Sequence, residues 1–479
     1  MLDRFEMAAA QRRLARRAVS TAARPQPALK MGADSLPQIE HIVVLMMENH
    51  SYDNYFGMLT GRGDGLQLGE DKLPSATNKA ENGDVVRMHP FEGTRQKGGV
   101  PSQTWNATHI QWNDGACDGF VRSIQQTLPG RDATVPMTYW DEHALPFYYG
   151  LANKFPLATR WFSSCLGPTF PNRRFMIAGT AHGLIDDLPF GMVDYPAAGT
   201  IFDLLTAHGI SWANYHHVTA LRINWRRLSH AWGLNFLRVL GAVLASILPQ
   251  LKPVMESKMQ TTADLYPLGM LRSINHLRSI DQFWQDARSG KLPSVTIVDP
   301  DFDSCSEENP QDIHVGEGFA AKVINAVMAG RGWPKTLLIW LYDEHGGYYD
   351  HVPPPPAPAP DDVPGRSPMQ RFFLLRLLLR YAGYAQQIDA ADAGPSTYEQ
   401  LGFRVPAVIV SPYAKPDYVT DTVYDHTSIL KLIERKWNLP PLTKRDAAAT
   451  DPLDAVDFDK PPQFLVPPTL PAPAVEWHG

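Results

Sequence analysis

Four short stretches of the sequence combine carboxylates, amides, hydroxyls and histidines with the residues of tight turns. They read ENHSYDNYFG from Glu48, GPTFPNR from Gly167, YDEHGGYYDHVP from Tyr342 and YDHTS from Tyr424. Hydroxyls and imidazoles attack electrophiles and move protons, whereas carboxylate and amide oxygens bind metal ions. The four stretches are therefore the places in the chain where we expect chemistry.

Two of these stretches each bring a pair of oxygen ligands. Glu48 and Asn49 open the first stretch, and Asp343 and Glu344 stand in the third. Hard divalent cations prefer carboxylate and amide oxygens, which favours Ca²⁺, Mg²⁺ or Mn²⁺, and a neighbouring histidine would admit Zn²⁺ or Fe. The sequence thus predicts a divalent metal ion bound by these four residues.

The second stretch offers a nucleophile. Thr169 lies between Pro168 and Pro171, which restrict the backbone and hold the hydroxyl in one place. A hydroxyl beside a metal ion can lose its proton near neutral pH and attack phosphorus, and Arg173 can fork onto phosphoryl oxygens. The histidines that can transfer a proton to a leaving group are His109, His216, His217, His314, His345, His351 and His426. Together these residues predict metal-assisted phosphoryl transfer.

Short apolar, β-branched runs must position these residues. The runs span 42–47, 295–298, 336–342 and 405–410, and helix-like stretches span 201–208, 319–329 and 428–437. Apolar strands that alternate with helices predict an α/β fold, with a mostly parallel central sheet and helices on both faces. Ligands of such sheets bind beyond the carboxyl ends of the strands. The runs end at Glu48, Asp299, Asp343 and Ser411, so we expect these polar residues at one rim, with Asp299 and Asp301 in turn or capping roles.

Composition excludes several classes of protein. The 479 residues are 44% hydrophobic and 20% charged, which is typical of a globular chain and not of a disordered or coiled-coil one. A net charge of -6 argues against a protein that binds nucleic-acid phosphates. The three scattered cysteines form neither a disulfide framework nor a zinc cluster.

The chain divides into an N-terminal arm over 1–37, a catalytic domain over 38–460 and a Pro-rich tail over 461–479. The arm carries basic residues without an apolar signal segment, so we expect a mobile amphipathic arm, and the cellular location stays unknown. The domain contains apolar helical insertions at about 222–275 and 361–400. Their apolar parts, 232–251 and 372–385, suit a membrane surface, a core helix or a homo-oligomer contact, and neither supports a transmembrane protein.

The four stretches resemble the motifs of the bacterial phosphoesterase family that contains non-haemolytic-type phospholipases C and related acid phosphatases. The family patterns ENxSFDxYFG, GPTxPNR, YDExGGxxDHVxPP and DHTS occur here in the same order between residues 39 and 439. The resemblance implies an alkaline-phosphatase-like fold, Glu48, Asn49, Asp343 and Glu344 as metal ligands, and Thr169 as the nucleophile. It further implies pocket histidines at His109 and His314, and less distinctly at His216 and His217.

The resemblance leaves three hypotheses for the function. The first is phospholipase C-type hydrolysis of phosphodiesters such as phosphatidylcholine, through a phosphothreonine intermediate. The second is an acid phosphatase or broad phosphomonoesterase with the same site, which Gln103 favours because many phospholipase relatives carry histidine there. The third is a non-catalytic binding or assembly protein on the same scaffold. Intact Glu48, Asn49, Thr169, Asp343 and Glu344 argue against the third.

Overall fold

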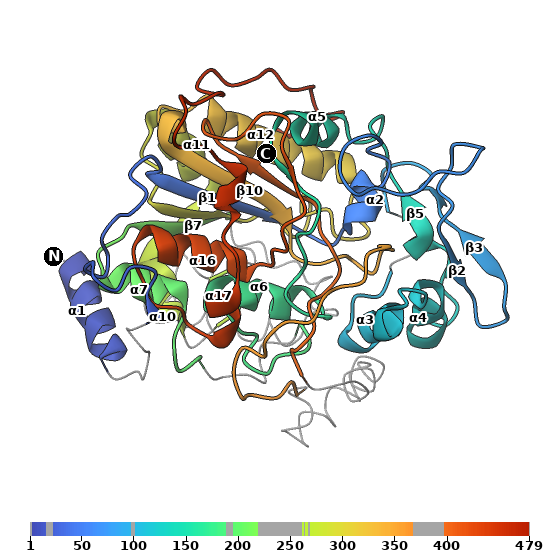
Figure 1. The fold of residues 1–479 in the computed structure, drawn as a ribbon, viewed down its shortest axis with the longest axis horizontal. Coiled ribbons are helices and arrows are strands. Elements are labelled where there is room, and N and C mark those ends of the chain that lie inside the picture. The colour runs from blue at the N-terminus through green and yellow to red at the C-terminus, as the bar shows by residue number, and fades with distance from the viewer. Residues whose placement is uncertain are drawn as a thin grey trace.

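The computed structural model describes residues 2–15, 23–96, 101–187, 195–218, 261–262, 264–266, 269–366 and 397–478. Within these residues, an eight-stranded sheet with the order β12-β6-β11-β10-β1-β9-β7-β8 forms the centre of the molecule (Figure 1). Its strands are β1 (His41–Met47), β6 (Leu157–Ala158), β7 (Trp212–His216), β8 (Leu277–Ser279), β9 (Val295–Val298), β10 (Thr336–Tyr342), β11 (Ala407–Val410) and β12 (Val419–Thr420).

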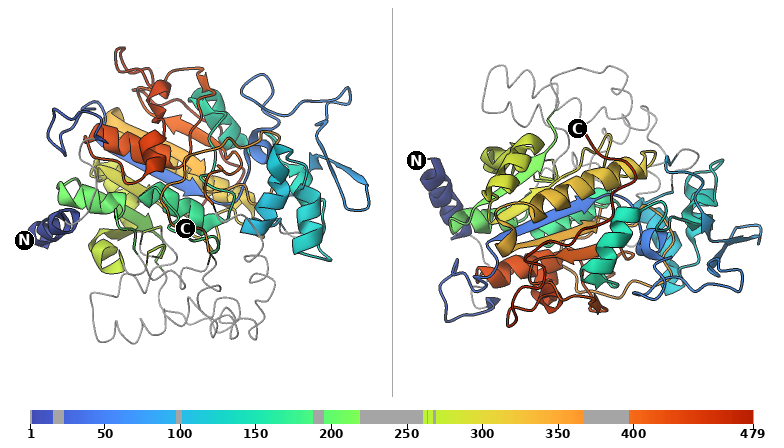
Figure 2. Two further views of the ribbon diagram at one scale, coloured as in Figure 1. Left: turned by 60° about the horizontal axis from the view of Figure 1, so that its bottom comes forward. Right: turned by 90° about the horizontal axis from the view of Figure 1, so that it is seen from above.

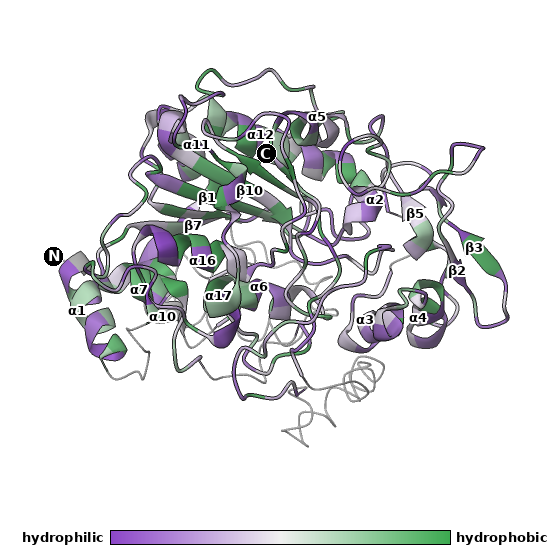
Figure 3. Cartoon of the chain, in the orientation of Figure 1, coloured by the Kyte–Doolittle hydropathy of each residue, from purple (hydrophilic) through white to green (hydrophobic). Residues whose placement is uncertain are grey.

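The sheet is mostly parallel, as the sequence predicts. β1 pairs in parallel with both β10 and β9, and β7 pairs in parallel with β9 and β8. Every residue of β1, β9 and β10 is buried, which explains why these strands consist mostly of apolar residues (Figure 3).

β11 departs from the prediction because it runs antiparallel to β10. In this register, Ala407 at its start pairs with Leu341 near the carboxyl end of β10. The carboxyl end of β11 therefore lies beside the amino end of β10. Ser411, which follows β11, is for this reason not at the rim formed by Glu48 and Asp343. The residues that precede β11, among them Arg404, lie at that rim instead.

Helices cover both faces of the sheet (Figures 1 and 2). One face carries α5, α11 and α12, and the other carries α6, α7 and α16, with α17 packed on α16. Their bounds are α5 (Pro146–Lys154), α6 (Thr169–Ala178), α7 (Ile201–Ala207), α11 (Ile280–Ser289), α12 (Ile313–Met328), α16 (Thr427–Lys436) and α17 (Lys444–Ala448). Short 3-10 turns span Asn113–Gly115, Val135–Met137, Ile274–His276, Trp333–Lys335 and Pro452–Ala455.

A lobe that the sequence did not predict lies beside the sheet, on the right of Figure 1. It contains α2 (Tyr52–Phe56), β2 (Thr77–Lys79), β3 (Val85–Arg87), β4 (His89–Pro90), α3 (Trp105–Trp112), α4 (Phe120–Thr127) and β5 (Thr138–Tyr139). The lobe has a small core of its own around Met88, Phe120 and Met137, which also packs on Phe403 of the main body.

Part of the N-terminal arm is helical and packs on the body of the protein, and the mobility of the arm stays a prediction. Helix α1 (Leu2–Leu14) packs on α7, where Gln11 Nε2 donates to the Ala207 carbonyl oxygen at 2.9 Å and Arg13 pairs with Asp203 at 3.6 Å. Helix α10 (Met270–Ser273) lies at the end of the first predicted insertion, about 222–275.

The apolar segments 232–251 and 372–385 both lie outside the described residues, so their predicted roles are not tested. Among the helices that are described, none has the length and apolar character needed to cross a membrane. The side chains of Cys117, Cys165 and Cys305 are buried.

Candidate active site

The four predicted metal ligands meet where β1 and β10 end. Met47 and Tyr342 are paired in the parallel register, so the residues that follow them lie side by side. Glu48, Asn49, Asp343 and Glu344 are all buried. Asp343 Oδ1 accepts the backbone N–H of Asn49 at 3.2 Å and that of Glu344 at 2.8 Å, which ties the two strand ends together.

Thr169 lies next to these four predicted ligands. It is the first residue of α6, with Pro168 as the N-cap, and it is only 5% exposed. Its hydroxyl donates to Asn49 Oδ1 at 3.4 Å, so the predicted nucleophile contacts one of the predicted ligands. The N–H of the next residue, Phe170, donates to the carboxylate of Asp187 at 2.8 Å.

Buried carboxyl groups are concentrated in this region, and their surroundings favour the protonated forms. Burial raises the pKa of Glu48 well above its usual range, and the charges of Glu308 and Asp343 raise it further. Burial and Asp343 do the same to Glu344. Burial also raises the pKa of Asp187 to about 7 and that of Glu308 to about 7, and these two carboxylates repel each other.

Two oxygens of this cluster fit a cation. Glu48 Oε2 and Glu344 Oε1 are buried and have no hydrogen-bond partner, a costly state for a carboxylate oxygen that a divalent ion would relieve. No group of three His, Cys, Asp or Glu side chains in the described part of the chain has metal-binding geometry. Glu48, Asp343 and Glu344 therefore do not form such a group in this structure, and the ligand set that they make up with Asn49 stays a prediction.

Arg173 does not have the surroundings expected of a phosphate-binding residue. Its guanidinium is fully buried, and Nε donates to Asp343 Oδ2 at 2.8 Å. Nη2 donates to the carbonyl oxygens of Met46 and Met47, and Nη1 lies 3.6 Å from Asp299 Oδ1. Because protein acceptors engage all three nitrogens, Arg173 positions Asp343 and the end of β1 in this structure.

Asp299 and Asp301 were predicted as turn or capping residues, and only Asp301 behaves so. Asp301 accepts the N–H of Asp303 at 3.0 Å and the hydroxyl of Ser304 at 2.7 Å. Asp299 is instead a buried partner of Arg173 and accepts the Thr261 hydroxyl at 2.6 Å.

Two of the candidate histidines support the ligands. His426 Nε2 donates to the Asp343 carbonyl oxygen at 2.6 Å, and its Nδ1 accepts the indole N–H of Trp161 at 3.4 Å. His345 lies 3.2 Å from Glu344 Oε2 through Nδ1 and 2.7 Å from the amide oxygen of Gln111 through Nε2. Burial lowers the pKa of both, that of His345 to about 3.

His109 and His314 are the two histidines that the resemblance places most clearly in the pocket. His109, on α3, donates from Nδ1 to the Trp105 carbonyl oxygen at 2.7 Å, and burial lowers its pKa. The imidazole is therefore neutral and Nε2 carries a lone pair. His314 stands in the first turn of α12, and its Nε2 is buried without a hydrogen-bond partner.

His216 and His217 lie in different surroundings. His216 ends β7, is buried, and contacts the His217 carbonyl oxygen through Nδ1 at 3.0 Å. The ring of His217 packs against Phe319 and Trp477, and so contacts α12 and the C-terminal tail.

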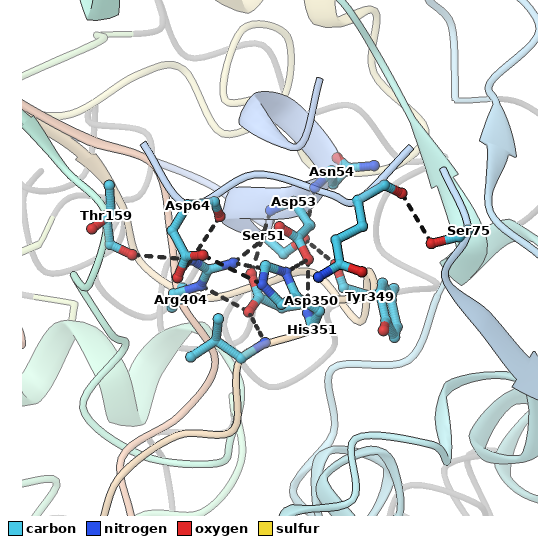
Figure 4. A network of polar contacts seen from close by, with 12 residues as sticks. Ser51, Asp53, Asn54, Asp64, Ser75, Thr159, Tyr349, Asp350, His351 and Arg404 are labelled. Atoms are coloured by element: carbon cyan, nitrogen blue, oxygen red, sulfur yellow. Dashed lines mark hydrogen bonds and ion pairs between the residues drawn. The ribbon is translucent and has the colours of Figure 1, made fainter. Parts of the chain in front are cut away.

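His351 belongs to a separate buried network, which Figure 4 shows. Arg404 pairs with Asp53 and Asp350, each at 2.9 Å, and His351 Nδ1 lies 2.7 Å from Asp53. Asp53 comes from the first motif and Asp350 from the third. The network thus fixes two of the four stretches to each other, and it explains why these motifs contain residues that do not reach the metal ligands.

Two carboxylates of the site, Asp187 and Glu308, were not found from the sequence. Neither follows a strand or sits in one of the four stretches, and both lie in irregular segments. Only the fold brings them to the carboxyl edge of the sheet.

The fold and this site define the class of the protein: an α/β enzyme that acts on a phosphoryl group. The chain belongs to the Phosphoesterase family, whose model matches residues 39–440, and it is a phosphoric ester hydrolase, as the sequence motifs predict.

Similar proteins carry phospholipase C names. The chain is 27% identical to non-specific phospholipase C6 of Arabidopsis thaliana, over 90% of this chain and 75% of that protein. It is 29% identical to phospholipase C B of Mycobacterium tuberculosis, over 89% and 79% of the two chains. It is 28% identical to hemolytic phospholipase C of Pseudomonas aeruginosa, over 86% of this chain and 54% of that one.

Proposed function

We propose that this chain is a metal-dependent phosphodiesterase of the phospholipase C type, which cleaves phospholipids such as phosphatidylcholine through a phosphothreonine on Thr169. The observation that carries the proposal is the 3.4 Å contact between the Thr169 hydroxyl and Asn49, beside buried carboxylates. The names of the relatives support the diester substrate. The mostly parallel sheet, with Thr169 at a helix N-terminus on its carboxyl edge, supports an alkaline-phosphatase-like fold.

The proposed reaction has two steps at phosphorus. In the first, Thr169 gives up its hydroxyl proton, its oxygen bonds to phosphorus, and the bond to the diacylglycerol oxygen breaks as that oxygen takes up a proton. In the second, a water oxygen bonds to phosphorus and loses a proton, and the Thr169 oxygen leaves and is protonated again. The net reaction consumes one water and releases diacylglycerol and phosphocholine.

Two histidines are assigned to the proton transfers. His109 is suited to accept a proton, because its Nδ1–H is held by the Trp105 carbonyl oxygen and Nε2 carries the lone pair. His314, whose Nε2 is buried without a hydrogen-bond partner, is assigned to the leaving oxygen.

Glu48, Asn49, Asp343 and Glu344 are the residues that would hold the cation. A divalent ion at this position would neutralise charge on the phosphoryl oxygens and lower the pKa of the attacking hydroxyl. The oxygen ligands favour Ca²⁺, Mg²⁺ or Mn²⁺ over Zn²⁺ or Fe.

A chromogenic choline phosphodiester and the matching phosphomonoester test the proposal. Both are assayed with and without chelator between pH 5 and 8, where histidine changes charge. We expect faster hydrolysis of the diester and loss of activity with the chelator. Preference for the monoester would make the enzyme a phosphatase, and activity that resists exhaustive chelation would exclude the metal.

The proposal includes contact of the segments 232–251 and 372–385 with the lipid surface, with a homo-oligomer as the alternative use of the same segments. Sedimentation of the full chain with phosphatidylcholine vesicles, compared with a chain lacking 372–385, tests the first. Analytical ultracentrifugation of both chains tests the second.

A further inference from the structure

The chain between β9 and α12 folds against Glu48, the first of the predicted metal ligands. The backbone N–H of Glu48 donates to the Ser306 carbonyl oxygen at 3.0 Å. The Ser306 hydroxyl also hydrogen-bonds the Glu48 carboxyl group, a contact that lowers the pKa of Glu48 against the effect of burial. Ser306, which is fully buried and lies outside the four sequence stretches, thus contacts Glu48 through both its main chain and its side chain.

The other contacts of the Ser306 hydroxyl leave its proton for Glu48. Oγ accepts the backbone N–H of Glu308 at 3.3 Å and the side-chain amide of Gln311 at 3.0 Å. A serine hydroxyl has two acceptor lone pairs and one donor. Because both lone pairs are engaged, the hydroxyl is left as a donor, and the Glu48 carboxyl group is the acceptor that it contacts.

Gln311 holds this serine in place. Its Oε1 accepts the N–H of Ser306 at 2.9 Å and that of Glu307 at 3.3 Å. Its Nε2 donates to the Phe302 carbonyl oxygen at 2.9 Å as well as to the Ser306 hydroxyl. A single amide side chain therefore closes the loop from Phe302 to Glu307, directly before Asp312, which caps α12.

The contact with Ser306 bears on how Glu48 can bind a cation. Glu48 Oε2 is buried and has no hydrogen-bond partner, so it is the oxygen that a metal ion would engage. A carboxyl group without partners turns broadly about its last side-chain torsion, and a hydrogen bond from Ser306 restricts this rotation. Partners that orient a ligand in this way are typically worth about 10- to 100-fold in metal affinity.

We propose that Ser306 is a positioning residue of the cation site: it orients the carboxyl group of Glu48 for the metal ion, and Gln311 holds Ser306 in that position. The inference rests on the proposed function, since it concerns the cation of that site. Ser306 acts through Glu48 and contacts neither metal nor substrate. Its removal should therefore weaken metal binding, while an excess of metal should restore the activity.

The variant Ser306→Ala tests the proposal, because it removes the hydroxyl and keeps the carbonyl oxygen that accepts the Glu48 N–H. Ser306→Thr restores a hydroxyl. Ser411→Ala is the matched control, since Ser411 is also fully buried and its hydroxyl accepts the Tyr413 N–H at 3.3 Å, away from the rim. The readout is the dissociation constant of Mn²⁺, measured by electron paramagnetic resonance on protein freed of metal by chelation. We expect this constant to rise about 10- to 100-fold in Ser306→Ala, much less in Ser306→Thr and not at all in Ser411→Ala.

Stability measurements separate positioning from general support of the fold. In urea titrations with chelator, Ser306→Ala and Ser411→Ala should lose comparable stability, although only the first should lose metal affinity. Gln311→Ala should also raise the Mn²⁺ dissociation constant. Its effect should combine less than multiplicatively with that of Ser306→Ala, because Gln311 acts through Ser306. With Mn²⁺ far above its raised dissociation constant, Ser306→Ala should regain most of the phosphodiesterase activity.

Four outcomes are decisive. Unchanged Mn²⁺ affinity in both Ser306→Ala and Gln311→Ala overturns the inference. An equal loss of affinity in Ser411→Ala overturns it as well, because lower stability alone would then weaken the site. If the unaltered protein binds Mn²⁺ with the expected dependence on Ser306 but hydrolyses neither ester, the proposed function fails and the inference stands. If it binds neither Mn²⁺ nor Ca²⁺, the inference fails whatever the activity.

Discussion

Arg173 and Asp343 form an ion pair that is wholly removed from solvent, with Nε 2.8 Å from Oδ2. Arg173 comes from α6, which begins with the proposed nucleophile, and Asp343 comes from the end of β10. The pair therefore fixes the distance between the helix that carries Thr169 and the strand ends that carry the predicted ligands. The negative charges of Asp343, Glu48 and Asp299 raise the pKa of Arg173 despite its burial, so the guanidinium stays charged.

The first prediction concerns this pair. Arg173→Met leaves Asp343 and Asp299 as unpaired buried carboxylates, and we expect it to lower the free energy of unfolding by about 3–5 kcal/mol. Arg435→Met, at a half-exposed pair with Asp451, should cost at most about 1 kcal/mol. Urea titrations of both variants give the comparison. If Arg173→Met is as stable as the unaltered protein and differs from it only in a higher KM, Arg173 binds the substrate phosphate instead.

The second prediction concerns the nucleophile. Thr169→Ala should lower kcat on the phosphodiester by about 10³-fold or more, because no protein oxygen remains to attack phosphorus. Thr169→Ser keeps the hydroxyl and should retain a measurable part of the activity. Mass spectrometry of acid-quenched Thr169→Ser and unaltered enzyme should detect a peptide that carries phosphocholine on residue 169, because choline stays on phosphorus when the diacylglycerol oxygen leaves. Thr169→Ala should lack this peptide. Full turnover by Thr169→Ala would identify water as the attacking group.

The third prediction concerns the cation. Burial and Asp343 raise the pKa of Glu344, which destabilises the metal-free folded state at neutral pH. Glu344→Gln removes this titrating group, so the metal-free variant should unfold at a higher temperature than the metal-free unaltered protein. The same variant should retain less metal after dialysis, and added Ca²⁺, Mg²⁺ or Mn²⁺ should stabilise it less. Elemental analysis and thermal scans with and without metal measure both effects.

Glu399→Gln, on an exposed residue outside the cluster, is the control and should change neither quantity. If Glu344→Gln retains as much metal as the unaltered protein and is stabilised by metal to the same extent, Glu344 is not a metal ligand.

Much of the fold was accessible from the sequence because its central strands are wholly buried. The strands at 295–298 and 336–342 have the predicted bounds, since both consist mostly of apolar and β-branched residues. The direction of β11 was not predictable, because a buried strand reads the same whether its neighbour is parallel or antiparallel. Because β11 is antiparallel to β10, the residues before β11, and not Ser411 after it, lie at the rim formed by Glu48 and Asp343.

The site was predictable only where a residue directly follows a strand or lies in a motif. Glu48, Asn49, Asp343 and Glu344 follow paired strands, and their meeting is a consequence of the parallel register. Asp187 reaches Phe170 from an irregular segment, and no local pattern marks such a contact. The supporting roles of Arg173, His345 and His426 depend on burial, which the motifs do not reveal.

The fourth prediction concerns Glu307, a fully buried carboxyl group that accepts the hydroxyls of Tyr55 at 2.7 Å, Tyr148 at 2.6 Å and Tyr342. Burial raises its pKa to about 8, although these hydrogen bonds lower it. At pH 7 the folded state therefore holds a proton that the unfolded chain has released above about pH 4.5, so stability is lost as the pH rises toward 8.

Glu307→Gln carries no titratable proton, so its free energy of unfolding should fall less than that of the unaltered protein between pH 5 and pH 8.5. The difference between the two falls should be of the order of a few kcal/mol, and any constant cost of the amide cancels because it is present at both pH values. Glu142→Gln, at an exposed position, should follow the unaltered protein. Urea titrations at the two pH values give all three curves. Parallel losses in Glu307→Gln and the unaltered protein would mean that Glu307 is already ionised at pH 5, and that the tyrosine hydroxyls outweigh its burial.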